Sequence, residues 1–364
     1  MVCRRFILNI LVSLIFFQTT VNGCCNSNCE TEKKECKCVQ FYLCKNDTNG
    51  DKFIIEDGSS VLEARTGGLC SGDEVPCCKL KARTPCPLCQ AQCGKRKPAF
   101  IDARITGSTT NFGEFPWMIA LFRMVVNNTY CEEPKYLSGG ALIHRNIVLT
   151  TAHSVISVKN NASLGLIARA GAWDLQNVNE AEKLQNRVVA EIIIHPRFNP
   201  ANLWNDFAIL RLDNPFILAD HISTICLPPP GKIISRGNCV VTGWGKEKYA
   251  DPNYKPSVLK SIDLQVVSRT DCTSQFRRTR AGPDFILHES FICAGGIEGV
   301  DTCAGDGGSP LVCPIDSSGN FYELSGLVSW GIGCGNAIPG VYASVGYAHG
   351  WITYTMRNLR LNSC

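Results

Sequence analysis

Short hydrophobic runs, separated by turn-forming residues, fill the C-terminal part of this 364-residue chain. Residues 147–150, 188–194 and 239–242 are examples, and each is rich in Val, Ile, Leu or Thr. Gly, Pro and Asn interrupt the chain between such runs. β-branched and apolar runs bounded in this way are typical of the strands of a barrel or sandwich. The pattern therefore predicts an all-β domain over residues 105–364.

The N-terminus carries a different hydrophobic pattern. Arg4 and Arg5 precede an apolar run over residues 6–17, and small residues follow at 21–23. This order is typical of a secretory signal peptide, which we assign to residues 1–23, and the run is too short to span a bilayer. No later segment approaches about 18 unbroken apolar residues. We therefore expect the mature protein to be soluble, secreted and extracellular, without a membrane segment.

Charge and cysteine content narrow the class of protein further. The net charge is +4 with no long basic run, so nucleic acid is not indicated as a partner. Twenty-two cysteines in a secreted chain indicate a disulfide framework. Zinc is the alternative for the close pairs Cys36-x-Cys38 and Cys86-x-x-Cys89. No second matching pair with histidines accompanies them, and we assign no metal site.

Six cysteines gather between residues 36 and 78, a segment too short to bury an adequate core without disulfides. They are Cys36, Cys38, Cys44, Cys70, Cys77 and Cys78. Spacing alone permits fifteen connectivities among six cysteines. Removal of Cys3 with the signal peptide leaves an odd number, so a free thiol or an intermolecular disulfide is expected. The cysteines without an assigned partner are Cys24, Cys25, Cys29, Cys86, Cys89, Cys131 and Cys364.

Eight short motifs follow one another from residue 104 onward. They are Arg-Ile-Thr-Gly at 104–107, Gly-Glu-Phe-Pro-Trp at 113–117, Leu-Thr-Thr-Ala-His at 149–153, Asn-Asp-Phe-Ala-Ile-Leu at 205–210, Thr-Gly-Trp-Gly at 242–245, Cys-Ala-Gly-Asp-Gly-Gly-Ser-Pro at 303–310, Ser-Trp-Gly at 329–331 and Pro-Gly-Val-Tyr at 339–342. In this order they resemble the trypsin-like serine proteases. The resemblance implies two six-stranded antiparallel barrels with a cleft between them, and a C-terminal helix over residues 347–361.

The resemblance places the parts of a serine protease active site on named residues, with one part missing. His153 matches the base, Asp206 the carboxylate that orients it, and the N–H groups of Gly305 and Gly307 the oxyanion hole. Gly307, however, stands where the family has the attacking serine. The resemblance therefore implies a protease fold without a nucleophile. Ser309 is the alternative nucleophile, although two residues of extended chain, roughly 7 Å, separate it from that position.

Two further features of the resemblance concern the surroundings of the site. Ser138 and Ser154 replace two cysteines that form a disulfide beside the base in the family, so we expect the site not to be held for turnover. Asp301 matches the floor of a pocket for Arg or Lys side chains, and Gly331 and Gly340 leave its walls open. This pocket could still bind a basic side chain through an ion pair. Equally, Asp301 could be a remnant.

The resemblance also implies disulfides. In the protease-like part these are Cys239–Cys313, Cys272–Cys293, Cys303–Cys334 and a bond from Cys226 to Cys93. The six clustered cysteines, closed by an adjacent pair, are similar to the clip domain of arthropod serine proteases. That family's pattern implies Cys36–Cys77, Cys38–Cys70 and Cys44–Cys78. The domains expected are therefore a cysteine-containing segment at 24–35, a clip domain at 36–78, a linker at 79–104 and the protease-like domain at 105–364.

Several sites of processing and binding are expected as well. Arg104-Ile105 matches the family's activation site, where the new N-terminus of Ile105 pairs with Asp306. Arg65, within the clip segment, is a second candidate for cleavage. Sequons predict glycosylation at Asn46, Asn127 and Asn161, and a calcium site is possible at Asp174, Glu180 and Glu182.

Together these features identify the chain as similar to non-catalytic clip-domain serine protease homologues, of the kind that includes prophenoloxidase-activating factors. The resemblance implies a secreted adaptor or cofactor of an arthropod immune protease cascade in the haemolymph, with a protease and prophenoloxidase as protein partners. Two alternatives stay open. The protein could antagonise such a cascade, or it could retain a hydrolase activity based on Ser309.

Overall fold

The computed structural model describes residues 36–40, 44–46, 53–55, 74–78, 93–97, 108–125, 133–176, 184–245, 257–298, 305–316, 319–333 and 335–359. Before residue 93 only strand backbones are described. There β1 (Cys36–Gln40) pairs antiparallel with β4 (Glu74–Cys78), and β2 (Cys44–Asn46) pairs with β3 (Phe53–Ile55). The expected clip segment therefore contains two small sheets. Cys36 lies opposite Cys78 in the first of them.

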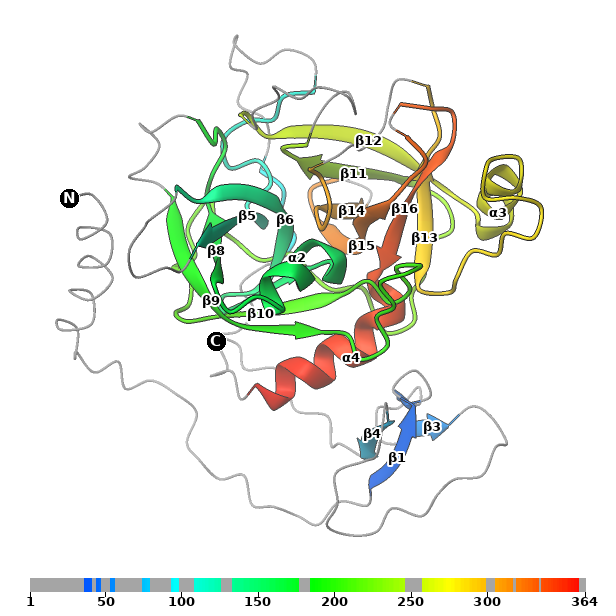
Figure 1. Ribbon diagram of the computed structural model, residues 1–364, viewed down its shortest axis with the longest axis horizontal. Helices are drawn as coiled ribbons and strands as arrows, with labels where there is room; N and C mark the ends of the chain where they lie inside the picture. Colours follow the sequence, from blue (N-terminus) through cyan, green and yellow to red (C-terminus); the bar gives the residue numbers. More distant parts are fainter. Residues whose placement is uncertain are drawn as a thin grey trace, which may run out of the picture.

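Two closed six-stranded antiparallel barrels form the rest of the fold (Figure 1), as the resemblance implied. The first has the strand order β10-β7-β6-β5-β8-β9 and the second β11-β12-β13-β16-β15-β14. The strands of the first are β5 (Met118–Val125), β6 (Lys135–His144), β7 (Ile147–Thr150), β8 (Leu164–Ala170), β9 (Gln185–Ile194) and β10 (Ala208–Leu212). Those of the second are β11 (Asn238–Gly243), β12 (Lys260–Val267), β13 (Phe291–Gly295), β14 (Pro310–Pro314), β15 (Tyr322–Trp330) and β16 (Pro339–Ser344).

Three helices accompany the barrels among the described residues: α2 (Ala152–Lys159), α3 (Arg269–Arg277) and α4 (Val345–Asn358). Helix α4 begins and ends earlier than the expected 347–361. It begins at Val345 because Ser344 is the N-cap, and the Ser344 side chain accepts a hydrogen bond from the backbone N–H of Tyr347. No helix in the described part of the chain has the length and apolar character needed to cross a bilayer.

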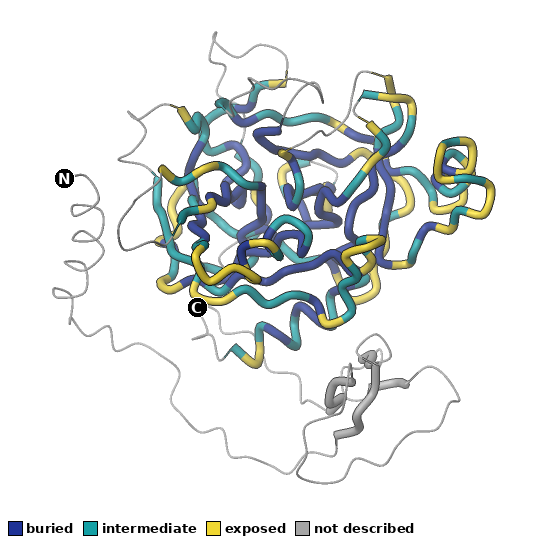
Figure 2. Tube along the Cα trace, viewed as in Figure 1, coloured by how far each residue is buried: buried dark blue, intermediate teal, exposed yellow. Residues whose placement is uncertain are grey.

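One hydrophobic cluster joins the two barrels to α4. Trp117 of the first barrel, Leu324 and Leu327 of β15, and Trp351 and Ile352 of α4 belong to it, and all are at most 5% exposed. In Figure 2 the buried residues, drawn in dark blue, run along strands of both barrels. Burial of a large apolar side chain contributes about 1.5–3 kcal/mol. The shared cluster thus fixes the position of one barrel against the other, and with it the groups that each barrel contributes to the cleft.

The segment 93–97 is bonded to the outside of this assembly. Cys93 forms a disulfide with Cys226. The Gly94 N–H donates to the Thr224 carbonyl at 2.8 Å, and the Gly94 carbonyl accepts from the Tyr322 N–H at 2.8 Å. The Gly94 φ of 73° leaves no alternative residue, because a Cβ there would lie 2.0 Å from the Tyr322 carbonyl oxygen. The remaining disulfides of the described residues are Cys239–Cys313 and Cys272–Cys293, two more of the expected pairs.

Candidate functional site

His153 and Asp206 come together at the edge of the first barrel. His153 is the second residue of α2, directly after β7, and Asp206 lies just before β10. Neighbouring β7 and β10 pair antiparallel, with Thr150 opposite Ala208, so the chain segments beyond them meet. The Nδ1 atom of His153 lies 2.6 Å from Oδ2 of Asp206. The base and its orienting carboxylate therefore form a hydrogen-bonded pair.

The Asp206 carboxylate is fully buried and accepts from three groups. Besides the His153 ring, the backbone N–H of His153 donates to Oδ1 at 2.9 Å and the Ser329 hydroxyl donates to Oδ2 at 2.6 Å. Hydrogen bonding of this kind is what allows a charge to be buried. The bond to the backbone N–H also caps the first turn of α2, which Thr151 does not cap with its own side chain.

Gly307 faces this pair from the second barrel. A Cβ built on Gly307 would lie 3.0 Å from Nε2 of His153 and 3.0 Å from Oγ of Ser154. The backbone of the loop is fixed from both barrels, because Gly139 N–H donates to the Gly307 carbonyl at 3.0 Å and Gly308 N–H donates to the Val328 carbonyl at 2.9 Å. The position of the attacking side chain is therefore preserved in space, and it contains no side-chain atom.

Ser154 takes part in the hydrogen bonding of the base, which the sequence did not suggest. Its Oγ lies 3.3 Å from Nε2 of His153 and 2.7 Å from the Thr151 hydroxyl. We expected the missing disulfide between positions 138 and 154 to leave the region poorly held. Instead, hydroxyl groups hold His153 on one side and Asp206 holds it on the other. The motifs around His153 and Ser329 contained the residues involved, but a hydroxyl in a motif does not reveal its partner.

Ser309, the alternative nucleophile, is fully buried. Its hydroxyl packs against the bare Cα atoms of two glycines: a Cβ on Gly139 would lie 2.1 Å from it, and one on Gly243 would lie 3.2 Å from it. Among the described residues this hydroxyl has no hydrogen-bond partner. A nucleophile must contact a substrate carbon at about 3–3.5 Å, which a buried hydroxyl cannot do.

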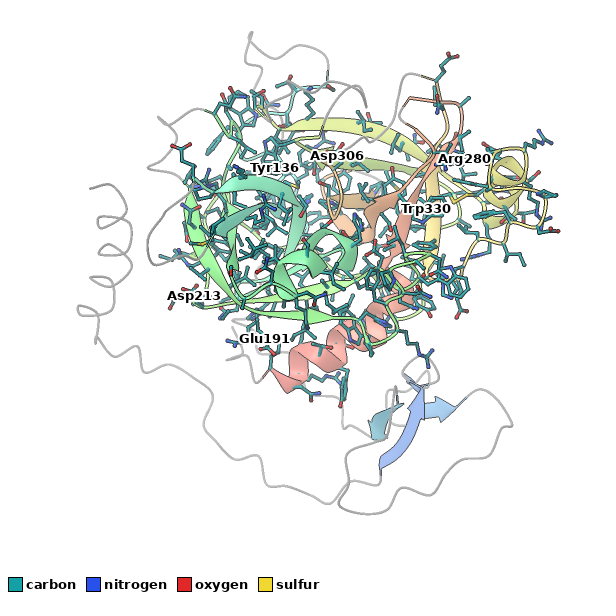
Figure 3. The ribbon with its side chains drawn as sticks, viewed as in Figure 1. Tyr136, Glu191, Asp213, Arg280, Asp306 and Trp330 are labelled. Atoms are coloured by element: carbon teal, nitrogen blue, oxygen red, sulfur yellow. A yellow bond between two sulfur atoms is a disulfide. The ribbon has the colours of Figure 1, made fainter. Side chains whose placement is uncertain are left out.

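Asp306 lies beneath the loop and is 9% exposed. Its Oδ1 accepts from the backbone N–H of Gly245 at 2.8 Å, and a Cβ on Gly245 would lie 2.2 Å from its Oδ2. Tyr136 donates from its hydroxyl to the carbonyl of Gly305 at 2.9 Å and so ties the same loop to β6. Tyr136 and Asp306 are labelled in Figure 3, near the meeting of the two barrels. The expected partner of Asp306, Ile105, lies outside the described residues.

The described part of the expected basic-residue pocket is open. A Cβ on Gly331 would meet only the Gly333 carbonyl oxygen, at 3.8 Å, whereas one on Gly340 would lie 3.1 Å from the Tyr342 hydroxyl. Trp330 beside them packs edge-on against Phe276, with ring centroids 5.2 Å apart. Asp301, the expected floor, lies outside the described residues.

Other expected sites also fall wholly or partly outside the described residues. They are Arg65, Arg104, Asn127, Glu180, Glu182, the Cys303–Cys334 disulfide, and the side chains of Asn46 and of the cysteines in the clip segment. Asn161 is exposed on the surface after α2. Within the described ranges no group of three or more His, Cys, Asp or Glu side chains could hold a metal ion.

Comparison with known proteins agrees with this geometry. The sequence model of the trypsin family matches residues 104–352. Phenoloxidase-activating factor 2 of Galleria mellonella is 44% identical over 272 residues, which cover 72% of this chain and 88% of that protein. Two proteins of Anopheles gambiae, named inactive CLIP domain-containing serine proteases A8 and A28, are each 34% identical. They cover 90% and 89% of this chain, and 91% and 90% of their own lengths. This chain is a clip-domain serine protease homologue of the trypsin family.

The homologue keeps the hydrogen-bonded base and carboxylate of its family at the edge of the cleft. Near this pair the chain has Gly307 and Ser154, at the two positions where the resemblance led us to expect the loss of a nucleophile and of a disulfide. The two changes meet in space, since the Cβ position of Gly307 and the Ser154 hydroxyl are 3.0 Å apart.

Proposed function

We propose that this homologue is a secreted, proteolytically inactive protein that serves as an adaptor or cofactor in an extracellular immune protease cascade. The single observation that carries the proposal is the position of Gly307. Position 307, which faces Nε2 of His153, has no side-chain atom that could attack a peptide carbonyl. In a comparable triad, loss of the serine lowers kcat by about 10⁶.

A hydrolase activity based on Ser309 is disfavoured by its burial. To reach a substrate, Ser309 would have to leave a site where two glycines accommodate its hydroxyl, and the loop that carries Asp306 would have to move with it. We therefore expect no peptidase activity toward substrates with Arg or Lys before the cleaved bond.

The name of one relative, phenoloxidase-activating factor 2, supports a role in phenoloxidase activation. We propose prophenoloxidase and its activating protease as the partners and the haemolymph as the location. Two surfaces could contact such partners: the clip segment at 36–78 and the open cleft. Beside the cleft, Trp204 is 42% exposed and stacks on His288 with ring centroids 4.4 Å apart. Exposed aromatic side chains held in place in this way are frequent anchors of protein interfaces.

Cleavage would act as a switch without creating an enzyme. The burial of Asp306 supports this, because a buried carboxylate is stabilised by a charged partner such as an N-terminus released at Ile105. Cleavage at Arg65 within the clip segment is the alternative. After cleavage at Arg104, Cys93–Cys226 would keep the N-terminal part attached. After cleavage at Arg65, the expected disulfides of the clip segment would have to do so.

The test is a reconstituted cascade of purified prophenoloxidase, its activating protease and this homologue. N-terminal sequencing after treatment with a trypsin-like protease would identify the cut, and Arg65→Gln and Arg104→Gln would serve as matched variants. We expect phenoloxidase activity to rise when the cleaved homologue is added, with no amidase activity from the homologue alone. Amidase activity that Ser309→Ala abolishes would overturn the proposal.

The sign of the effect on the cascade distinguishes an adaptor from an antagonist. A fall in phenoloxidase activity on addition of the homologue would favour the antagonist. The same preparation can test the remaining expectations: mass spectrometry for glycans at Asn46, Asn127 and Asn161, and thermal unfolding with and without Ca²⁺ for a site at Asp174, Glu180 and Glu182.

A further inference from the structure

The Ser154 hydroxyl belongs to a continuous chain of hydrogen bonds that ends at the buried carboxylate. Thr151 Oγ1 lies 2.7 Å from Ser154 Oγ, which lies 3.3 Å from His153 Nε2, and His153 Nδ1 lies 2.6 Å from Asp206 Oδ2. A hydroxyl beside an imidazole that a third group orients is the arrangement by which proteins activate a serine.

The directions of these bonds follow from the acceptors. The Asp206 carboxylate can only accept, so the His153 ring donates from Nδ1, and in the neutral imidazole its Nε2 is then an acceptor. Ser154 then donates to Nε2, and Thr151 donates to Ser154 Oγ. In this arrangement Nε2 can take the Ser154 proton, and the Thr151 hydroxyl can stabilise the oxygen that has lost it.

The loss of the side chain at position 307 opens space beside Ser154. The Cβ position of Gly307 is 3.0 Å from Ser154 Oγ, so the Gly307 Cα lies within about 4.5 Å of that oxygen. Among the described residues, no acceptor receives the backbone N–H of Gly307. The His153 side chain is 30% exposed and Ser154 is partly exposed. A small electrophile can therefore approach the hydroxyl, with a free N–H group nearby.

We propose that Ser154 is a nucleophile, activated by His153, that reacts with small, activated acyl or phosphonyl esters. With a fluorophosphonate, a bond forms between Ser154 Oγ and phosphorus while the bond between phosphorus and fluorine breaks. The hydroxyl proton passes to Nε2 of His153 and fluoride leaves. Asp206 and Ser329 are positioning residues, because Asp206 holds the imidazole, Ser329 holds Asp206, and neither touches the substrate.

This reactivity does not extend to peptides and is compatible with a cofactor role. Ser154 lies on the His153 side of the cleft, and the backbone that would position a peptide carbonyl is arranged around Gly307 instead. An amide also needs a protonated leaving group, whereas fluoride or an activated alcohol departs without help. A misplacement of about 1 Å can cost a peptide substrate about 10²-fold in rate.

Incubation of the purified full chain with an alkyl fluorophosphonate probe, followed by peptide mass spectrometry, tests the proposal. We expect the phosphonyl adduct on Ser154, its loss in Ser154→Ala and in His153→Gln, and unchanged labelling in Ser309→Ala, the matched serine control. An adduct on another residue, or an unlabelled wild-type protein, would refute the assignment.

Two measurements keep this test separate from folding and from the proposed function. Ser154→Ala must have the same Tm as the wild type. Its loss of labelling then reports the missing hydroxyl and not a failure to fold. The cascade assay with Ser154→Ala should show undiminished cofactor activity, because the adaptor role does not use the nucleophile. If labelling fails while the cascade responds, only the Ser154 assignment falls.

Discussion

Gly307 and Ser154 compete for one small volume beside the imidazole. A Cβ at 307 would meet both Nε2 of His153 and Oγ of Ser154 at 3.0 Å, which is tighter than most Cβ contacts in proteins. Restoring a serine at 307 therefore places two hydroxyls next to a single acceptor nitrogen. The residue that replaced the lost disulfide thus limits any return of peptidase activity.

For this reason Gly307→Ser alone should give little amidase activity, while Gly307→Ser combined with Ser154→Ala should give about tenfold more or better. The measurement is hydrolysis of an Arg peptide anilide after cleavage of the chain. Gly307→Ala with Ser154→Ala is the inactive control. Equal rates in the two serine variants would mean that Ser154 does not interfere with position 307.

Arg96 and Lys97 are adjacent, and each forms an ion pair, so the effect of burial on the two ion pairs can be compared. Arg96 Nε donates to Oε1 of Glu114 at 3.0 Å, and that carboxylate is nearly buried, whereas Lys97 pairs with Asp220, whose side chain is fully exposed. Arg96→Ala would leave a buried charge with fewer donors and should cost about 1–3 kcal/mol of unfolding free energy.

Lys97→Ala should leave stability unchanged within error, because exposed ion pairs contribute little. Urea unfolding of both variants measures the difference. No loss in either variant would show that the segment 93–97 is held by its backbone bonds and disulfide alone, and a similar loss in both would show that burial of Glu114 does not matter.

How far the site could be predicted differs from residue to residue. The roles of His153, Asp206 and Gly307 could be predicted because each lies in a recognisable motif. Strand pairing then brings the loops that carry them together. The contact between Ser154 and Nε2 was not predictable, since it depends on the rotamer of a side chain that the family uses for a disulfide. Nor does the spacing of Ser309 reveal that its hydroxyl points into the interior.

At the scale of elements, α2 shows why the base and carboxylate do not by themselves indicate catalysis. Asp206 accepts the backbone N–H of His153 and so satisfies one of the free donors at the start of α2. The hydroxyl of Thr151, the N-cap residue, is hydrogen-bonded to Ser154 and does not cap the helix. The carboxylate therefore has a structural role that persists when the nucleophile is absent.

At Gly346, helix α4 packs closely against the backbone of Lys232 in the segment before β11. A Cβ there would lie 1.9 Å from the carbonyl oxygen of Lys232, a backbone atom that cannot rotate away. Although alanine favours a helix by about 1 kcal/mol over glycine, Gly346→Ala should lower the unfolding free energy by about 1–3 kcal/mol through overpacking.

The matched control is Asn358→Ala, at the exposed end of the same helix, which should stay within about 0.5 kcal/mol of the wild type. Denaturant unfolding of both proteins provides the comparison. If Gly346→Ala is as stable as Asn358→Ala, the helix can shift away from Lys232 without cost.

The elements themselves were predictable to different degrees. The runs at 147–150, 188–194 and 239–242 all lie within strands, because a barrel strand buries enough β-branched and apolar residues to leave a clear pattern. The sequence did not predict α3. That helix buries only Cys272 and Phe276, so its apolar face is too narrow to stand out.

At the scale of the whole molecule, three histidines link stability to pH. Burial lowers the pKa of His144, His288 and His349 below the ordinary value of 6.5. Neighbouring arginines add to the effect at His144 and His349, while at His288 the nearby Glu289 opposes it more than Arg269 adds to it. Below that value the unfolded chain binds more protons than the folded one. The stability that depends on neutral imidazoles is therefore complete above pH 6.5 and declines as the pH falls below it.

We expect the Tm to fall between about pH 7.5 and about pH 5.5, a window in which ordinary carboxylates stay ionised. His349→Gln, in α4, should reduce that fall, because the substituted side chain cannot take up a proton. Scanning calorimetry of both proteins at the two pH values is the measurement. An unchanged fall in His349→Gln would assign the pH dependence to other groups.

The bonds that hold residues 93–97 also determine how far the N-terminal module can travel. Fifteen positions separate Cys78, the end of β4, from Cys93, and at about 3.5 Å each they reach at most about 50 Å. A partner could bind both the clip segment and the barrels. Once it has bound one of them, the other is present at an effective concentration that can reach the millimolar range. Since Cys93 precedes Arg104, proteolytic activation would leave this avidity intact.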